Sequence, residues 1–213
     1  YGEWMSIWTE LSVPAGKRAG YDTMVGNHST NGTPATNLDI PLQFWFCRNP
    51  GLALPLIALQ YHEVKVDIEF RTSNAITTAD APTAVLTTCK LYVDYVYLDT
   101  DERRRFAQVS HEYLIEQLQF TGDESVSVAT TKKIDLTFNH PVKELIWVHQ
   151  VDANRTAVDA TEPLMYDSIS TCDVKLQLNG HDRFSARREE YFGRVQPFKH
   201  HTNVPRANLT LAL

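Results

Sequence analysis

The sequence predicts an all-β protein built from antiparallel β-sandwiches. Short segments in which apolar and polar residues alternate recur along the chain, and turn-forming residues separate them. Asn-Gly pairs at 31–32 and 179–180 favour tight hairpin turns, and further turns are predicted at 14–16 and 140–141. An apolar fraction of 43% with 22% charged residues is typical of a globular chain, so disorder is not expected.

Residues 42–70 carry the clearest pattern. Residues 42–47 place large apolar groups on both faces of a predicted strand, which is typical of a strand buried between two layers. Asn49 and Pro50 then predict a helical turn, because Asn caps helices and Pro lacks only an N–H that the first turn leaves unpaired. The apolar run 52–59 is too short to cross a bilayer. Residues 64–70 alternate strictly, which predicts a half-buried strand.

Four more strands and one helix complete the prediction. The strands are expected at 91–98, 133–138, 145–148 and 174–178, from the same alternation. The helix is expected between residues 105 and 119, where five residues recur at helical spacing: Phe106, Val109, Tyr113, Leu114 and Leu118. Acidic residues precede this segment and Gly122 follows it, as at many helix ends. We expect this helix to join two β-rich regions.

Long segments of the chain closely resemble the major capsid protein of large nucleocytoplasmic DNA viruses, especially the algal-virus (phycodnavirus) and iridovirus-like members. In family order they are EWMSIWTEL with GYDTMVGN, PLQFWFCRNPGLALPLIALQYHEV, LYVDYVYLDTDERRRFAQVSHEYLIEQLQ, IDLTFNHPVKELIWV and REEYFGRVQPFKHHTN. Together they cover nearly the whole chain. We take as the structural signature of this resemblance Phe44, Trp45, Phe46, Pro50, Gly51, Pro55, His62, Pro141 and Trp147.

The resemblance implies a double jelly roll, which is a pair of antiparallel β-sandwiches joined by a short helix. Residues 1–104 would form the C-terminal part of the first roll, 105–120 the linker helix, and 121–213 the N-terminal part of the second roll. The chain opens directly on apolar sequence and ends inside a strand-like run. We therefore expect both rolls to be incomplete here, and the chain to be the central part of a roughly doubled one.

The resemblance also implies a structural role without enzymatic activity. Three copies would form a homotrimeric, pseudo-hexagonal capsomer, and contacts between trimers would tile an icosahedral shell. The implied partners are minor capsid and penton proteins, with an inner virion membrane reached through other proteins. The implied location is the virion capsid, after assembly in the host cytoplasm.

Charge argues against direct contact with nucleic acid. The formal net charge is −6 and the pI is near 5.7, whereas proteins that coat phosphate backbones need clustered Lys and Arg. The short basic cluster at 103–105 follows three acidic residues that nearly neutralise it: Asp99, Asp101 and Glu102.

The three cysteines predict free thiols. Cys47, Cys89 and Cys172 are odd in number and widely spaced, without a C-x-x-C pair that would indicate a metal or redox site. Cys47 and Cys89 lie among apolar residues, so we expect them to be buried.

No catalytic, metal or cofactor site is expected. His200 and His201 with His181 form the best metal candidate, but neighbours on a strand point to opposite faces and cannot share one ion. The acid pairs Asp101-Glu102 and Glu189-Glu190 adjoin arginines, so solvated salt bridges are expected rather than a glycosidase dyad. The sequence contains no nucleophile elbow, P-loop, zincin or dinucleotide motif.

The sequence leaves open whether the protein is glycosylated and whether it binds carbohydrate. Four sequons occur, at Asn27, Asn31, Asn154 and Asn208, and the first two lie in the polar loop 26–37, which we expect at the surface. Unused sequons are expected in a protein made in the cytosol, although a glycosylated outer loop stays open. The alternative function is a β-sandwich carbohydrate-binding module or lectin, suggested by Trp4, Trp8, Trp45 and Trp147, which we otherwise expect in the core. An enzyme with a β-sandwich fold is a further alternative, but we find no acidic residues in the sequence that would converge on one catalytic site.

Overall fold

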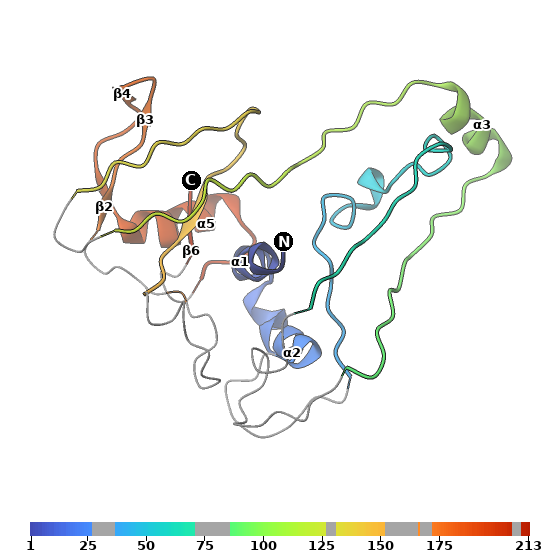
Figure 1. Ribbon diagram of the computed structural model, residues 1–213, viewed down its shortest axis with the longest axis horizontal. Coiled ribbons are helices and arrows are strands. Elements are labelled where there is room, and N and C mark those ends of the chain that lie inside the picture. Colours follow the sequence, from blue (N-terminus) through green and yellow to red (C-terminus); the bar gives the residue numbers. More distant parts are fainter. Residues whose placement is uncertain (27–36, 71–85, 127–130, 152–165, 167–171, 206–209) are drawn as a thin grey trace. The chain divides into compact units, whose positions relative to one another are not determined.

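The computed structural model divides the chain into two compact units, which are described separately below (Figure 1). The first unit comprises Tyr1–Leu42, Lys65–Asp94 and Leu145–Leu213, and the second comprises Gln43–Val64 and Tyr95–Glu144. The structure describes residues 1–26, 37–70, 86–126, 131–151, 166, 172–205 and 210–213.

The first unit opens with two helices that the β-sandwich prediction does not contain. They are α1, Gly2–Ser12, and α2, Ala15–Val25, drawn in blue in Figure 1. Pro14 separates them, because its ring disfavours helical geometry in the residue before it and removes a backbone donor. Gly26 ends α2 at φ 78°, where a Cβ would come within 2.7 Å of Leu38 Cδ2. Both the left-handed backbone and the close approach therefore require glycine at this position.

All three strand pairs in the described part of the chain are antiparallel, as predicted. β1, Ile146–Val148, lies within the predicted strand 145–148 and pairs with β6, Thr210–Ala212. Backbone hydrogen bonds in both directions between Leu145 and Leu213, each 2.9 Å, extend this ladder by one residue pair.

The predicted strand 174–178 is divided between two pairs. β2, Asp173–Val174, pairs with β5, Arg187–Arg188, and β3, Gln177–Leu178, pairs with β4, His181–Asp182. The predicted Asn-Gly turn joins β3 to β4, with Asn179 at φ 51° and Gly180 at φ 80°. Positive φ at both central residues is the geometry of a type I′ hairpin turn.

The core of the first unit surrounds Phe192. This residue lies in a π-helical turn, Tyr191–Val195, which continues into α5, Gln196–His200. Its ring is 0% exposed, with centroids 5.3 Å from Trp147 of β1 and 5.7 Å from Phe184. Leu11 of α1, Ala212 of β6 and Pro197 of α5 are also buried. The helical turns, β1, β6 and α1 thus share one core.

In the second unit, the predicted helical turn after residue 48 is confirmed. A short 3₁₀ helix, η1, covers Pro50–Leu52, and the Asn49 side chain accepts a hydrogen bond of 2.9 Å from the Gly51 N–H. Asparagine as cap and proline as first helical residue therefore play the predicted roles.

The predicted helix 105–119 is misplaced. Helix α3 covers Thr100–Gln108, so the acidic residues form its first turn rather than precede it. It begins where Asp99 caps the Thr100 N–H at 2.6 Å. It ends because Val109 is extended and His111 Nε2 donates to the Phe106 carbonyl at 2.9 Å, which occupies an acceptor that a continuing helix would use. The apolar spacing beyond residue 109 does not produce a helix.

The predicted strand at 42–47 is also wrong. Its backbone turns, with the Cys47 N–H donating to the Phe44 carbonyl at 2.9 Å. Arg48 Nε and Nη2 donate to the Gln43 carbonyl at 3.3 and 3.2 Å. These local hydrogen bonds use backbone groups that a neighbouring strand would otherwise pair. Phe44 and Phe46 still share a face, with stacked rings 5.3 Å apart, and both are half-buried.

Three further predicted strands, at 64–70, 91–98 and 133–138, are unpaired in the described chain. Their apolar side chains are largely exposed; Phe70 is 56% and Tyr95 64% accessible. The alternation of apolar and polar residues identifies segments that would have one apolar and one polar face. A segment forms part of a β-sheet only if a second segment lies at hydrogen-bonding distance from it.

Candidate functional site

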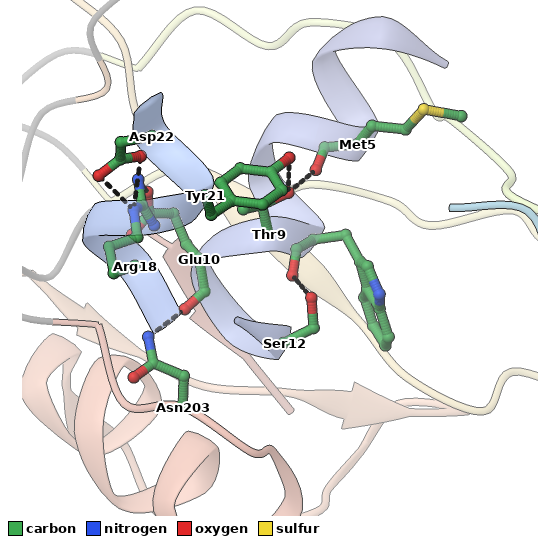
Figure 2. A network of polar contacts seen from close by, with 9 residues as sticks. Met5, Thr9, Glu10, Ser12, Arg18, Tyr21, Asp22 and Asn203 are labelled. Carbon is green, nitrogen blue, oxygen red and sulfur yellow. Dashed lines mark hydrogen bonds and ion pairs between the residues drawn. The ribbon is translucent and has the colours of Figure 1, made fainter. Parts of the chain in front are cut away.

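A network of polar contacts joins the two N-terminal helices (Figure 2). Thr9 of α1 is buried at 3% exposure, and its Oγ1 donates to the Met5 carbonyl at 2.7 Å. The same oxygen shares a 3.2 Å hydrogen bond with the Tyr21 hydroxyl of α2. Because buried hydroxyls are costly to leave unpaired, this contact specifies how α1 and α2 meet.

An arginine at the start of α2 reinforces this junction. Arg18 Nη2 lies 2.6 Å from Glu10 Oε1 of α1, and Arg18 Nε lies 3.0 Å from Asp22 Oδ1. Burial alone would lower the pKa of Arg18, but the hydrogen bond and charge of Glu10, with those of Asp22, raise it above its ordinary value. The guanidinium therefore stays cationic and holds carboxylates from both helices.

Asn203 connects this helical hairpin to the distant C-terminal part of the chain. Its Nδ2 donates to the Glu10 carbonyl at 2.7 Å, and its backbone N–H donates to the Leu11 carbonyl at 3.0 Å. Nearby, the ring of His201 meets Trp8 edge-on with centroids 5.9 Å apart. Figure 2 shows Asn203 directed at the last turn of α1. Residues 201–203 thus contact α1 through one ring and two hydrogen bonds.

A second network organises the other unit around Glu116. Glu116 Oε2 binds Arg48 Nη1 at 2.8 Å, and Glu116 Oε1 binds Lys143 Nζ. Trp45 and Tyr113, each three residues before a member of this ion pair, meet edge-on with ring centroids 6.4 Å apart. One carboxylate therefore ties the turn at 44–48 to two later segments of the chain.

Replacing Glu116 by glutamine should lower the free energy of unfolding by about 1 kcal/mol, since it removes the charge that two cations share. Urea unfolding measures this difference. Glu124→Gln is the matched control, because Glu124 forms an exposed ion pair with the single cation of Lys132, across 3.1 Å, in the described part of the chain. Equal effects of the two substitutions would contradict a special role for Glu116.

The residues of the predicted structural signature do not form one site. Phe44, Trp45, Phe46, Pro50 and Gly51 lie in the turn and in η1, whereas Pro55 lines an open apolar hollow of about 490 Å³ with Trp45 and Phe106. His62 and Pro141 are exposed. Trp147 belongs to the core of the first unit.

The structure also shows where the histidines considered as metal ligands and the two acid pairs lie. His200 ends α5 and His201 follows it, so this pair lies at a helix end and not on a strand. In the part of the chain that the structure describes, no three His, Cys, Asp or Glu side chains could hold a metal ion together. Asp101 is exposed and 3.7 Å from Arg104, as predicted. Glu189 is only 2% exposed, so the predicted solvated setting is wrong there.

The cysteines are free, but two of them do not lie where the sequence predicted. Cys47 and Cys89 are exposed rather than buried, while Cys172 is half-buried. Burial raises the pKa of the Cys172 thiol, and the negative charges of Glu189 and Asp173 raise it further. Cys172 is therefore a weak nucleophile at neutral pH.

Each of the four tryptophans packs against another aromatic ring, and Trp45 also lines the open hollow. Trp4 and Trp8 lie one turn apart on α1 with centroids 5.6 Å apart, Trp45 contacts Tyr113, and Trp147 contacts Phe192. All four are half-buried. The sequon residues Asn27, Asn31, Asn154 and Asn208 lie outside the described residues, so their role stays a prediction. Among the helices that are described, none has the length and apolar character needed to cross a membrane.

Two known protein-family models match the sequence of this chain. A family model described as the major capsid protein N-terminus matches residues 1–99. A second, described as large eukaryotic DNA virus major capsid protein, matches residues 102–211, which are 110 of the 213 residues. The chain belongs to the major capsid protein family of large eukaryotic DNA viruses. The predicted resemblance is confirmed.

Relatives within the major capsid protein family come from several viruses. The major capsid protein of Pyramimonas orientalis virus is 56% identical over 212 residues, covering 96% of this chain and 50% of that protein. That of Paramecium bursaria Chlorella virus 1 is 37% identical over 239 residues, covering 93% and 53%. That of Wiseana iridescent virus is 28% identical, covering 94% and 51%. The chain spans about half the length of these curated relatives.

Solved capsid structures resemble this member of the family along its whole length. The quasi-atomic model of the PBCV-1 virus capsid superposes with a TM-score of 0.74 at 31% identity, covering 100% of this chain and 60% of that one. A PBCV-1 capsid protein crystal structure fitted into a reconstruction of the virophage Sputnik gives 0.72 at 34% identity, covering 100% and 59%. The path of the chain is thus that of a viral capsid protein.

Sequence reasoning missed α1, α2 and the role of Asn203. Trp4, Trp8 and Leu11 recur at helical spacing before Pro14, a signal that would have predicted α1. No sequence signal near Asn203 indicates its contact with α1, because that contact depends on the fold.

Proposed function

We propose that this chain is the shell-forming part of a major capsid protein that builds an icosahedral virus particle. The observation that carries the proposal is the pair of family matches, which together span residues 1–99 and 102–211. The likeness to the PBCV-1 virus capsid at a TM-score of 0.74 supports it. The role is structural: β-sandwiches provide stiff walls, and the loops between strands provide contacts and the outer surface.

The proposed architecture is a double jelly roll that forms homotrimers. Residues 1–104 contribute to the first roll and residues 121–213 to the second. The predicted linker is residues 105–120, and we place the helix of this junction at α3, Thr100–Gln108, which overlaps the start of that range. The position where one family match ends, residue 99, and the next begins, residue 102, supports this assignment.

Assembly in this proposal depends on surface complementarity and involves no enzymatic step. A closed cyclic trimer buries large apolar contacts, whereas smaller polar contacts between trimers allow assembly errors to be corrected. Minor capsid and penton proteins complete the shell in the host cytoplasm, and an inner virion membrane is reached through them. The genome is not contacted directly, consistent with the net charge of −6.

The native mass of the complete gene product tests this function. Multi-angle light scattering should give three times the chain mass, and electron microscopy should show capsomers with a pseudo-hexagonal outline. A stable monomer that binds immobilised glycans would instead support the carbohydrate-binding alternative. The packing of Trp4, Trp8 and Trp147 against other rings does not favour that alternative, and Trp45, which lines the open hollow, would be its candidate contact.

The loop at residues 26–37 should lie on the exterior of the particle. Its small polar residues favour exposed backbone, so antibodies raised against this segment should label intact virions, and short insertions should leave capsomers intact. Labelling is measured by immunogold microscopy on intact and disrupted particles. Labelling confined to disrupted particles would mean that the first roll is oriented the other way.

A further inference from the structure

Apart from Glu3 in its first turn, helix α1 has few features that would stabilise it in isolation. Its 11 residues are fewer than the length at which isolated helices become stable in water. Its N-cap position, Tyr1, makes no side-chain capping bond, and its last turn carries no basic residue that could bind the terminal carbonyl groups. The stability of α1 must therefore come from what packs against it.

Helix α2 does not supply that stability by itself. It also lacks a side-chain cap, has no acidic residue in its first turn, and includes Gly16 and Gly20, which have low helix propensity. The two helices contact each other through Thr9 and Tyr21 and through Arg18 with Glu10. Because neither helix is stable by itself, the hairpin of α1 and α2 requires contacts with another segment of the chain.

The segment after α5 supplies it. Asn203 donates to the carbonyl groups of Glu10 and Leu11, two of the last four carbonyls of α1, which a helix cannot satisfy internally. Leu11 is 0% exposed, so its carbonyl lies where water competes poorly. The ring of His201 against Trp8 covers the same side of the helix.

We propose that Asn203 is a positioning residue that caps α1 from 193 residues away and thereby latches the helical hairpin onto the C-terminal segment. The hairpin belongs to the part of the chain that matches the N-terminal family model, and Asn203 belongs to the part that matches the second model. The latch therefore joins two family regions through hydrogen bonds to backbone groups. Of the two bonds, only the one from Nδ2 to the Glu10 carbonyl depends on asparagine at position 203, because the N–H that binds the Leu11 carbonyl belongs to the backbone.

Hydrogen exchange of the complete gene product tests the latch. Peptides covering residues 2–12 should lose protection by about tenfold in Asn203→Ala, because one of two capping bonds is removed. Peptides covering β1 and residues 191–200 should keep their protection. Thr202→Ala is the matched control, because Thr202 is exposed beside the latch. A uniform loss across all peptides would overturn the proposal, since it would mean general destabilisation.

Asn203→Asp separates hydrogen bonding from packing. Aspartate keeps the volume of asparagine but replaces the donor with a carboxylate that faces the Glu10 carbonyl at the negative end of α1. Protection of residues 2–12 should therefore fall further than in Asn203→Ala. Protection near that of the natural protein would overturn the proposal, because it would show that volume alone matters.

A milder variant covers the case in which Asn203→Asp does not accumulate as folded protein. Asn203→Ser keeps the backbone N–H bond to Leu11 and shortens the side-chain donor. Protection of residues 2–12 should fall between that of the natural protein and that of Asn203→Ala. Protection equal to that of the natural protein would contradict the latch.

Discussion

Phe192→Ala should lower the free energy of unfolding by about 3–5 kcal/mol, the range for removing a fully buried aromatic side chain. Phe192 is 0% exposed and contacts the rings of Trp147, Phe184 and Tyr191. Its loss leaves a cavity between the helical turn and β1 that neighbouring rings cannot fill without leaving their rotamers. Urea unfolding followed by tryptophan fluorescence measures the change, because Trp147 lines the cavity.

Phe198→Ala is the matched control for this substitution. Phe198 lies six residues later in α5 and is 77% exposed, so its removal should cost less than about 1 kcal/mol. Similar costs at the two positions would contradict the assignment of the core. In the complete gene product, Phe192→Ala should also reduce the yield of soluble capsomers, whereas Phe198→Ala should leave it near normal.

Leu11→Ala should lower the free energy of unfolding by about 2–5 kcal/mol. Leu11 is 0% exposed at the end of α1, and its carbonyl accepts the backbone hydrogen bond from Asn203. The substitution keeps that carbonyl but removes the apolar contact that brings the helix to the core. The free energy is measured by urea unfolding, as for Phe192.

Leu178→Ala in β3 provides the comparison for Leu11. Leu178 is 53% exposed in the same unit, so its truncation should cost well under half as much. An equal loss would indicate that α1 contributes little to the core of the first unit.

The parts of the fold that could be predicted from the sequence are those with local causes. Asn49 before Pro50 predicted a cap, and Asn179 before Gly180 predicted a turn; both are confirmed because the deciding atoms lie within a few residues. The strand at 145–148 was placed to within one residue. Backbone preferences and side-chain capping act at this short range, so single-sequence patterns capture them.

The errors have causes that local patterns do not contain. Apolar spacing from Phe106 to Leu118 suggested one helix, but the capping carboxylate of Asp99 moves its start to residue 100 and His111 ends it early. The burial of Glu189 and the exposure of Cys47 both depend on segments distant in sequence. Strand pairing has the same dependence, since β1 pairs with β6 more than sixty residues later.

The candidate sites show most clearly the difference between features with local causes and features that depend on distant parts of the sequence. The hairpin network was not predicted, because Asn203 gains its role only when residues 10 and 11 come within hydrogen-bonding distance. The link through Glu116 likewise joins Arg48 to a residue 68 positions later. By contrast, the family was identified from long segments of sequence, and family models confirm it.

The contact between α1 and Asn203 sets an order of events during translation. At about 5–20 residues per second, roughly 10–40 s separate the emergence of Glu10 from that of Asn203, 193 residues later. During that interval the side of the helix that carries Leu11 cannot yet dock on the C-terminal segment, so ribosome-associated chaperones have a defined period in which to shield it. The need to protect this side of α1 from aggregation therefore arises early in each round of synthesis.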